Sequence, residues 1–61
     1  MERGAKMAID YSYTMEDFYG DECKITVYAD GTATAETFWT RKAFCIEDRA
    51  YDWAYRRGFR E

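Results

Sequence analysis

Four carboxylates lie close together in the stretch Met15–Glu22, which reads MEDFYGDE. Paired carboxylates catalyse acid–base chemistry on sugars, and clustered carboxylates bind divalent cations. Sugar hydrolysis requires a cleft that holds the substrate between the two groups, which a chain of 61 residues can hardly provide. The spacing also lacks the alternating acids and terminal glutamate of an EF-hand. We therefore take the cluster as a candidate binding surface rather than a catalytic or metal site.

The residue types that most enzymes use are missing from the chain. It contains no histidine, so it lacks the commonest general base and the commonest metal ligand. Its one serine, Ser12, falls in the middle of a predicted strand, and neither Cys23 nor Cys45 has an imidazole to activate it. No glycine-rich phosphate loop or cysteine-pair zinc motif is present. The sequence predicts a protein without catalytic activity and without a cofactor.

Length and composition predict one folded domain, residues 1–61. Apolar residues make up 48% of the chain and aromatic residues 20%, far more than in a disordered chain. No apolar run approaches the roughly 18 residues of a membrane-spanning helix, and the first residues lack the apolar region of a signal peptide. Two cysteines are too few for a disulfide framework, so we interpret Cys23 and Cys45 as small, partly buried apolar residues. We expect a cytoplasmic protein that does not bind membranes.

Acidic residues are concentrated in the first two thirds of the chain. Residues 8–40 contain seven carboxylates and one lysine, a formal charge of −6. Residues 41–61 contain six cations and four carboxylates, a formal charge of +2. Such an asymmetry bears on partners and association rates more than on the fold.

A period of two indicates a strand over about residues 7–15. Apolar or aromatic residues occupy every second position, with small or polar residues between them. The alternating positions expected on the buried face are Met7, Ile9, Tyr11, Tyr13 and Met15.

The dipeptide Asp30-Gly31 indicates a hairpin, for which two registers compete. A two-residue turn would mix core and solvent residues on one face, with Val27 opposite Thr34. A three-residue loop from Ala29 to Gly31, with the glycine in the left-handed region, aligns the apolar positions instead. The pairs it predicts are Val27 with Ala33, Ile25 with Ala35, Lys24 with Glu36 and Thr26 with Thr34. The pattern favours this second register.

The last part of the chain has the period of an amphipathic helix, predicted over about residues 41–57. Its inner stripe consists of Ala43, Ile46, Ala50, Trp53, Ala54 and Arg57. Gly58 is a natural end for the helix. Its start has two candidates: Thr40 as a cap, or a later start that places Glu47 and Asp48 in the first turn, where acidic residues are favourable.

These elements predict an α+β fold, a three-stranded antiparallel β-meander with one C-terminal amphipathic helix packed on one face. The strands are expected over about residues 7–15, 22–29 and 32–39. Small side chains at Ala33 and Ala35 leave room for Trp53, so Trp53→Ala is expected to cost roughly 3–5 kcal/mol. The opposite face is expected to be threonine-rich and acidic. Its expected members are Asp10, Ser12, Thr14, Lys24, Thr26, Tyr28, Thr32, Thr34, Glu36 and Phe38.

The predicted partner-binding surface combines carboxylates of the acidic loop with acids and rings of the outer sheet face. Its residues are Asp10, Glu16, Asp17, Tyr19, Asp21, Glu22, Tyr28, Asp30 and Glu36. Aromatic rings beside charges are typical of binding hot spots, and the charges speed encounter with a basic surface. Lysine at all four loop carboxylates is therefore expected to abolish binding and to leave the fold intact. The alternative interpretation is a solvated acidic loop with ordinary exposed rings.

The charge of the sheet segment argues against direct binding of nucleic acid, because stacking platforms work with a positively charged groove. Arg56, Arg57 and Arg60 are interpreted as cations that suit a helix C-terminus. A basic surface complementary to acids is often one that binds phosphates. We expect a monomer or weak homodimer that binds a basic nucleic-acid-binding protein and blocks its access to DNA. The alternative is a small structural or assembly subunit completed by a partner chain or by self-association.

In size, acidity, tyrosine content and lack of a catalytic set, the chain resembles the small phage-encoded anti-CRISPR proteins that mimic DNA. The resemblance is one of overall character across the whole chain, so no residue role transfers from it. It implies an inhibitor without catalysis that binds a Cas effector subunit near the site that reads target DNA, in the cytoplasm of the host cell. The basic helix end departs from a pure DNA mimic and confines any mimicry to one side of the molecule.

Overall fold

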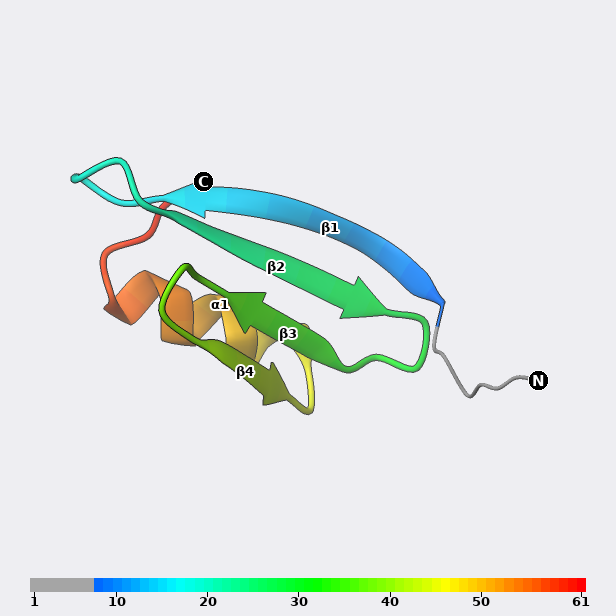
Figure 1. The fold of residues 1–61 in the computed structure, drawn as a ribbon. Coiled ribbons are helices and arrows are strands. Elements are labelled where there is room, and N and C mark those ends of the chain that lie inside the picture. Colours follow the sequence, from blue (N-terminus) through cyan, green and yellow to red (C-terminus); the bar gives the residue numbers. More distant parts are fainter. Residues whose placement is uncertain (1–7) are drawn as a thin grey trace.

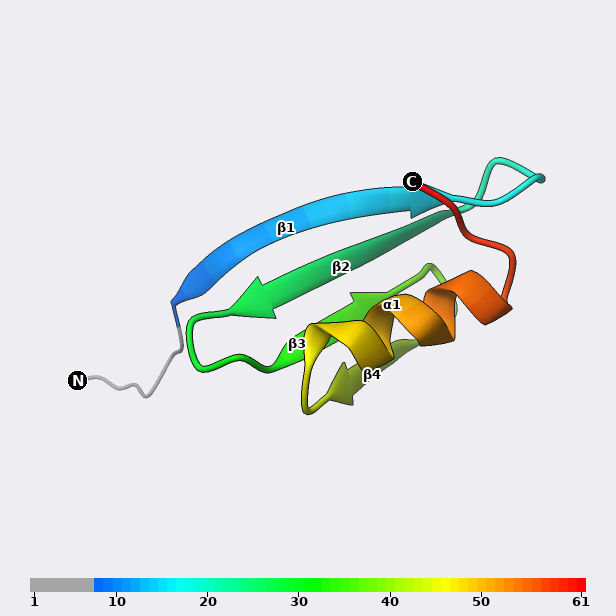
Figure 2. The same ribbon diagram turned by 180° about the vertical axis from the view of Figure 1, so that it is seen from behind.

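Four antiparallel strands in chain order form one sheet, and a single helix lies across one of its faces (Figures 1 and 2). The structure, a computed structural model, describes residues 8–61. The elements are β1 (Ile9–Glu16), β2 (Glu22–Tyr28), β3 (Ala33–Glu36), β4 (Arg41–Phe44) and α1 (Glu47–Arg56). The α+β class, the antiparallel order and the C-terminal helix are confirmed, whereas the prediction of three strands was wrong by one.

The β2–β3 hairpin has the predicted register. All four predicted pairs are present, from Lys24 opposite Glu36 to Val27 opposite Ala33. Gly31 adopts a left-handed φ of 94°, and the Tyr28 N–H donates to the Thr32 carbonyl at 2.8 Å, which closes a three-residue loop. The requirement that apolar residues share one face therefore selects the pairing.

Strand β1 alternates as predicted from Tyr13 onward, whereas Tyr11, which was predicted on the buried face, is 44% exposed. The register shifts between Ile9 and Tyr11, which leaves Asp10 as the extra residue of a bulge. Ile9 pairs with Tyr28 and is 61% exposed, so its predicted place on the buried face was wrong. Met7, the other predicted core residue at this end, lies outside the described residues.

The segment predicted as the first turns of the helix is strand β4. It follows a two-residue turn at Phe38 and Trp39, in which the Thr37 N–H donates to the Thr40 carbonyl at 2.8 Å. The Thr37 hydroxyl oxygen accepts the N–H groups of Trp39 and Thr40 at 3.3 and 3.1 Å. Glu36 then pairs with Arg41 across the strands. The Thr37 side chain thus closes this turn, as hydroxyl side chains can, without the glycine that marks the Asp30-Gly31 hairpin.

Helix α1 starts at Glu47, the later of the two predicted starts. The residue before it, Ile46, has an extended backbone and provides no side-chain cap, so the prediction of Thr40 as cap was wrong. Glu47 and Asp48 occupy the first turn. The helix packs on β2, β3 and β4 through small side chains, and its fully buried residues are Ala50 and Ala54. Ile46 is exposed and Trp53 is half-buried, so the predicted stripe holds only in part.

The helix ends in a glycine turn that returns the chain to the core. Gly58 has a φ of 98°; its N–H donates to the Tyr55 carbonyl at 3.0 Å, and the Phe59 N–H donates to the Ala54 carbonyl at 3.1 Å. This pair of bonds is the Schellman motif, with its usual apolar contact between the residue after the glycine and the last turn. Gly58 as the stop is confirmed. Phe59, which the sequence interpretation left outside the core, has no exposed surface.

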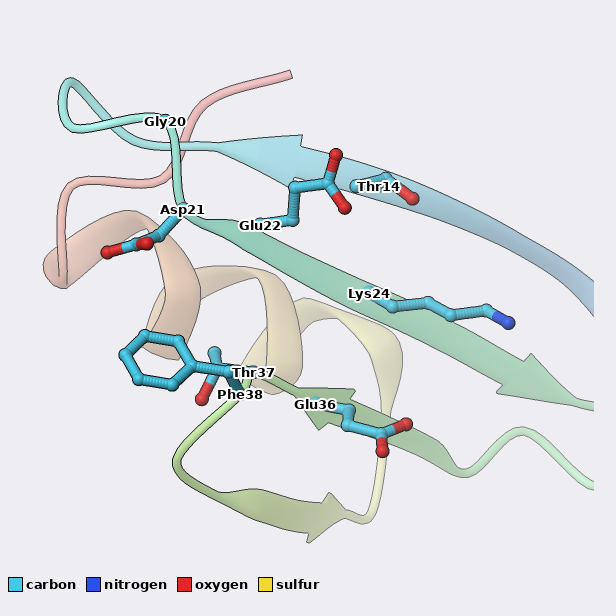
Figure 3. A pocket seen from close by; sticks show the side chains of 8 residues that line it. All are labelled: Thr14, Gly20, Asp21, Glu22, Lys24, Glu36, Thr37 and Phe38. Atoms are coloured by element: carbon cyan, nitrogen blue, oxygen red, sulfur yellow. The ribbon is translucent and has the colours of Figure 1, made fainter.

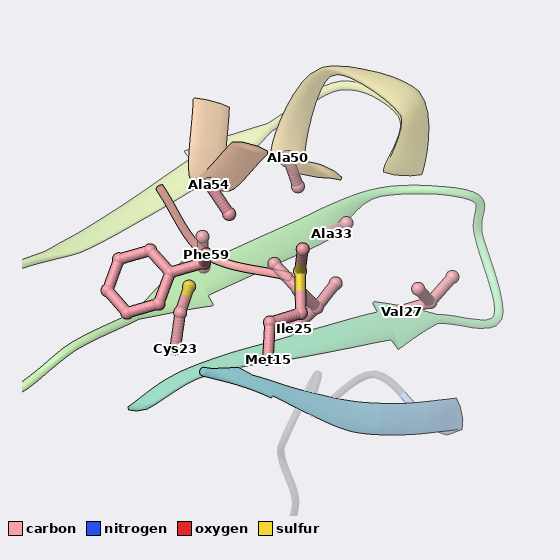
Figure 4. Close-up of a cluster of buried hydrophobic side chains, with 9 residues drawn as sticks. Met15, Cys23, Ile25, Val27, Ala33, Ala50, Ala54 and Phe59 are labelled. Atoms are coloured by element: carbon pink, nitrogen blue, oxygen red, sulfur yellow. The ribbon is translucent and has the colours of Figure 1, made fainter. Parts of the chain in front are cut away.

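Figure 4 shows the core side chains between α1 and the sheet. They are Met15, Cys23, Ile25, Val27, Ala33, Ala35, Ala50, Ala54 and Phe59. Both cysteines are free: Cys23 is buried, which raises the pKa of its thiol, and Cys45 is exposed. Phe59 is the largest fully buried side chain in residues 8–61 and stacks on Trp39 at 6.1 Å.

Phe59→Ala is expected to lower the free energy of unfolding by about 3–5 kcal/mol, because it leaves a cavity in a small core. Trp53→Ala is expected to cost less, since the indole is only half-buried. Phe18→Ala is the control, because this ring is 95% exposed. Urea unfolding followed by circular dichroism measures all three. An unchanged unfolding midpoint in Phe59→Ala would show that this ring is not part of the core.

Candidate protein-binding surface

The predicted partner-binding residues fall into two groups at opposite ends of the sheet. Six of them lie at or near the β1–β2 loop end: Glu16, Asp17, Tyr19, Asp21, Glu22 and Glu36. Asp10, Tyr28 and Asp30 lie at the other end, beside the β2–β3 loop. The length of β1 separates the groups by about 23 Å at 3.3 Å per residue. We therefore take the first group as the candidate site, and the assignment of Asp10, Tyr28 and Asp30 to the same partner stays a prediction.

Two like charges face each other at this end of the sheet. Glu16 is directly opposite Glu22, and both side chains are exposed. Like charges in this arrangement repel and destabilise the pairing. The one ion pair found within residues 8–61 joins Arg56 to Asp52 on the helix, at 2.7 Å. No cation of these residues therefore forms an ion pair with Glu16 or Glu22. Their negative potential therefore faces solvent.

Four aromatic rings lie in the two turns at the same end, and three of them project into solvent. Phe18 and Tyr19 form the tip of the β1–β2 loop, are 95% and 86% exposed, and contact each other edge to face at 5.7 Å. Phe38, 81% exposed, and Trp39 form the tip of the β3–β4 turn and contact each other at 5.0 Å. Figure 1 shows both turns at the end toward which β1 and β3 point. Tyr19 was predicted here, whereas Phe38 was expected on the sheet face and Trp39 was not considered.

A hollow open to solvent lies between the two turns on the face away from the helix (Figure 3). Its lining residues are Thr14, Gly20, Asp21, Glu22, Lys24, Glu36, Thr37 and Phe38. Three carboxylates and one ammonium give it a formal charge of −2. Lys24 is next to Thr14 on one side and Glu36 on the other. The hollow thus presents one ring and excess negative charge to a ligand.

The rest of this sheet face is less acidic than predicted. One row across the sheet carries Thr14, Lys24, Glu36 and Arg41, in which the charges alternate in sign. The next row carries Ser12, Thr26, Thr34 and Ala43 and has no charge. The face is threonine-rich as expected, but its excess acidity is confined to the end that carries the two turns.

Two of the predicted binding residues build turns. The Asp17 carboxylate oxygen Oδ1 accepts the N–H groups of Tyr19 and Asp21, each at 2.9 Å. The Asp30 Oδ1 accepts the Thr32 N–H at 3.0 Å and the Thr32 hydroxyl at 2.7 Å, and these bonds lower the pKa of Asp30. Aspartate commonly closes turns in this way. Lysine at Asp17 would remove the oxygen that accepts both hydrogen bonds. The predicted fourfold lysine variant would therefore not leave the loop intact.

A second groove runs along the face of α1 that Tyr11 and Tyr13 of β1 contact. The hydroxyls of Tyr11 and Tyr13 both donate to the Glu47 carboxylate, the Tyr13 bond at 2.8 Å. The groove is lined by Glu47, Asp48, Tyr51, Asp52 and Tyr55. The sequence interpretation missed it because it placed Tyr11 and Tyr13 in the core and considered Glu47 only as an acidic residue of the first helical turn.

The arginines of the helix end contact their own helix. The Arg57 guanidinium lies over the Trp53 ring at 4.2 Å, and that of Arg60 lies over the Tyr55 ring at 3.6 Å. Arg60 also donates to the Tyr55 carbonyl at 2.9 Å, one of the last carbonyls of the helix. These contacts agree with the interpretation that the cations complement the negative end of the helix.

Asp17→Ala is expected to lower the free energy of unfolding by about 1 kcal/mol, because two turn amides lose their acceptor. Asp17→Asn is the matched control, since its side-chain oxygen can still accept both bonds. Hydrogen exchange at the Tyr19 and Asp21 amides measures the effect locally. Equal exchange rates in the alanine and asparagine variants would contradict the turn-closing role.

The contacts of Tyr11 and Tyr13 with Glu47 make stability depend on alkaline pH. The hydrogen bond to Glu47 raises the pKa of Tyr11 to about 12, and burial together with the same carboxylate raises the pKa of Tyr13. Folding favours the neutral phenols, so this stability is complete below the ordinary tyrosine pKa of about 10 and is lost as pH rises through about 12. We expect the urea midpoint to fall over this range, and to fall less in Glu47→Gln. Identical pH dependence in both proteins would contradict the assignment.

Residues 8–61 contain no cluster of three or more histidine, cysteine or acidic side chains arranged to hold a metal ion. No helix in this part of the chain is long and apolar enough to cross a membrane. Comparison of the chain with protein-family models, with curated proteins and with solved structures finds no match. Its functional assignment therefore depends on the chemistry of its own surface.

Proposed function

We propose that the chain is a non-catalytic inhibitor that binds a basic, nucleic-acid-handling protein and blocks its access to DNA. The surface that binds is the sheet end that carries the two aromatic turns and the Glu16–Glu22 pair. The observation that supports this most is the combination of exposed rings at Phe18, Tyr19 and Phe38 with carboxylates at Glu16 and Glu22 that form no ion pair within residues 8–61. Neither feature stabilises the fold, and together they match the composition of a protein-binding hot spot.

The two kinds of side chain have separate roles in this proposal. The carboxylates of Glu16, Asp21 and Glu22 attract a cationic surface and occupy positions that DNA phosphates would otherwise take. The rings at the two turns enter apolar pockets of the partner and slow dissociation. Because Phe18 and Tyr19 lie at a loop tip, they reach a recessed site that a flat sheet would not.

The absence of histidine and the open form of the hollow support binding rather than catalysis. The narrower proposal, an anti-CRISPR protein that acts on a Cas effector subunit in the cytoplasm of the host cell, rests on overall resemblance. The exposed acidic end is consistent with partial DNA mimicry on one side of the molecule. The arginines contact their own helix, which supports a partner that is a protein rather than nucleic acid.

A small assembly subunit is the second candidate, because exposed rings also favour self-association. Phe18, Tyr19 and Phe38 are the observation that favours it. The two candidates differ in their response to salt. Binding steered by carboxylates weakens steeply as ionic strength rises, whereas apolar assembly does not.

A pair of single charge reversals tests the proposal. Glu22→Lys is expected to weaken inhibition about tenfold or more in a gel-shift assay of target-DNA binding by purified DNA-targeting Cas effector complexes. Asp10→Lys changes the net charge equally but lies at the far end of β1, so it should inhibit as the unaltered protein does. Equal loss in both variants would show that only net charge matters. Absence of inhibition in every complex would overturn the anti-CRISPR assignment.

A further inference from the structure

The outer edge of β1 is a strand edge that the proposed function does not use. In an antiparallel ladder, successive residues direct their N–H and C=O groups to opposite sides. Glu16 exchanges two hydrogen bonds with Arg60, at 2.9 and 2.8 Å, on the side away from β2. By alternation, the backbone groups of Thr14 and Ser12 also face outward. No other segment of residues 8–61 pairs with them.

The contact of Arg60 with Glu16 shows the direction in which a strand can pair with this edge. Arg60 forms an antiparallel bridge with Glu16, so it occupies the first position of a strand that would run along β1. Residues added in line with Arg60 would lie opposite Thr14 and then Ser12. The edge therefore has a defined direction and register for an incoming strand.

The side chains of such a strand would alternate between the two faces of the sheet. On the helix side they would lie next to Tyr11 and Tyr13, which stack at 6.2 Å, and face the groove described above. On the helix, Tyr51 and Tyr55 also stack at 6.2 Å, and Asp48 lies beside them. Carboxylates and tyrosine faces together favour a cation.

The chain itself places a guanidinium at one end of this groove. Arg60 lies over the ring of Tyr55 at 3.6 Å while its backbone bonds to Glu16. One residue thus combines edge pairing with stacking on a tyrosine of the helix. In a partner strand that continues this register, the residues between those opposite Thr14 and Ser12 point to the helix side, so basic residues at these positions would lie over the tyrosines.

We propose that the outer edge of β1 binds an extended basic segment of a partner protein, which adds antiparallel to β1 with lysine or arginine side chains over the tyrosine groove. The inference is independent of the proposed function, because it does not involve the aromatic turns. A second copy of the chain is a poorer occupant. Its β1, Ile9–Glu16, contains no lysine or arginine to place over the tyrosine groove, and its Asp10 and Glu16 would add negative charge there.

The probe for this site is the synthetic peptide acetyl-Thr-Arg-Thr-Arg-Thr-amide. Titration followed by NMR is expected to show binding, and slower hydrogen exchange at the Ser12 and Thr14 amides. Two control peptides separate the contributions: one is N-methylated on alternate residues, which removes strand hydrogen bonds but keeps the charge, and one has glutamate for arginine. Binding of the N-methylated peptide as tight as that of the probe, or no binding of the probe, would overturn the proposal.

Matched variants locate the site on the protein. Ser12→Pro removes an outward N–H that the internal ladder does not use, and is expected to weaken peptide binding about tenfold. Ala43→Pro is the control, because the N–H of Ala43 faces outward from β4, the other edge strand. Phe18→Ala leaves this site untouched and should bind the peptide normally, which separates it from the aromatic turns. Equal peptide affinity of Ser12→Pro and the unaltered protein would overturn the assignment. If Ser12→Pro does not fold, the test is the affinity of the unaltered protein for the N-methylated peptide compared with its affinity for the probe peptide.

Discussion

The fold depends on the return of Phe59 into the space between helix and sheet. Helix α1 contributes only Ala50 and Ala54 as fully buried residues, and strand β3 directly below it contributes Ala33 and Ala35, so the larger buried side chains of the sheet come from Met15, Cys23 and Ile25. Alanines allow close packing but bury little apolar area, so a domain of this size needs one large ring to complete its core. The left-handed turn at Gly58 directs that ring inward.

The same return fixes the surfaces around it. The backbone of Arg60 reaches the edge of β1 and joins the C-terminal segment to the strand that carries Glu16. Trp39 stacks on Phe59, so the base of the β3–β4 turn is held against the core while Phe38 projects into solvent. The aromatic turns are therefore mounted on a rigid base, which lowers the entropy lost when a partner binds them.

Sequence patterns predicted those features that depend on local periodicity or on glycine. The β2–β3 register follows from the alternation of Ile25 and Val27 with polar residues, and the helix stop follows from Gly58. Strand β4 was missed because the turn before it is closed by the Thr37 hydroxyl, and because a four-residue strand is too short to show a clear period of two. The bulge at Asp10 has no glycine to mark it.

The candidate site could be predicted only where chain neighbours form it. Glu16, Asp21 and Glu22 flank one loop, so their clustering follows from the sequence. The approach of Phe38 to that loop depends on the undetected turn. The tyrosine groove exists because the helix lies on β2, β3 and β4. The helix therefore leaves the face of β1 on the same side of the sheet partly exposed to solvent. No periodicity of β1 alone contains that information.

The order of the strands in the sheet has a consequence for how the chain folds. Every strand pairs with its neighbour in sequence, so three hairpins can form quickly and separately with short loops to close. Contacts that join distant segments include the packing of α1 on β2 and β3, the bridge between Glu16 and Arg60, and the bonds from Tyr11 and Tyr13 to Glu47. Since Phe59 follows every strand, a ribosome must release nearly all of this segment before the domain can fold cooperatively.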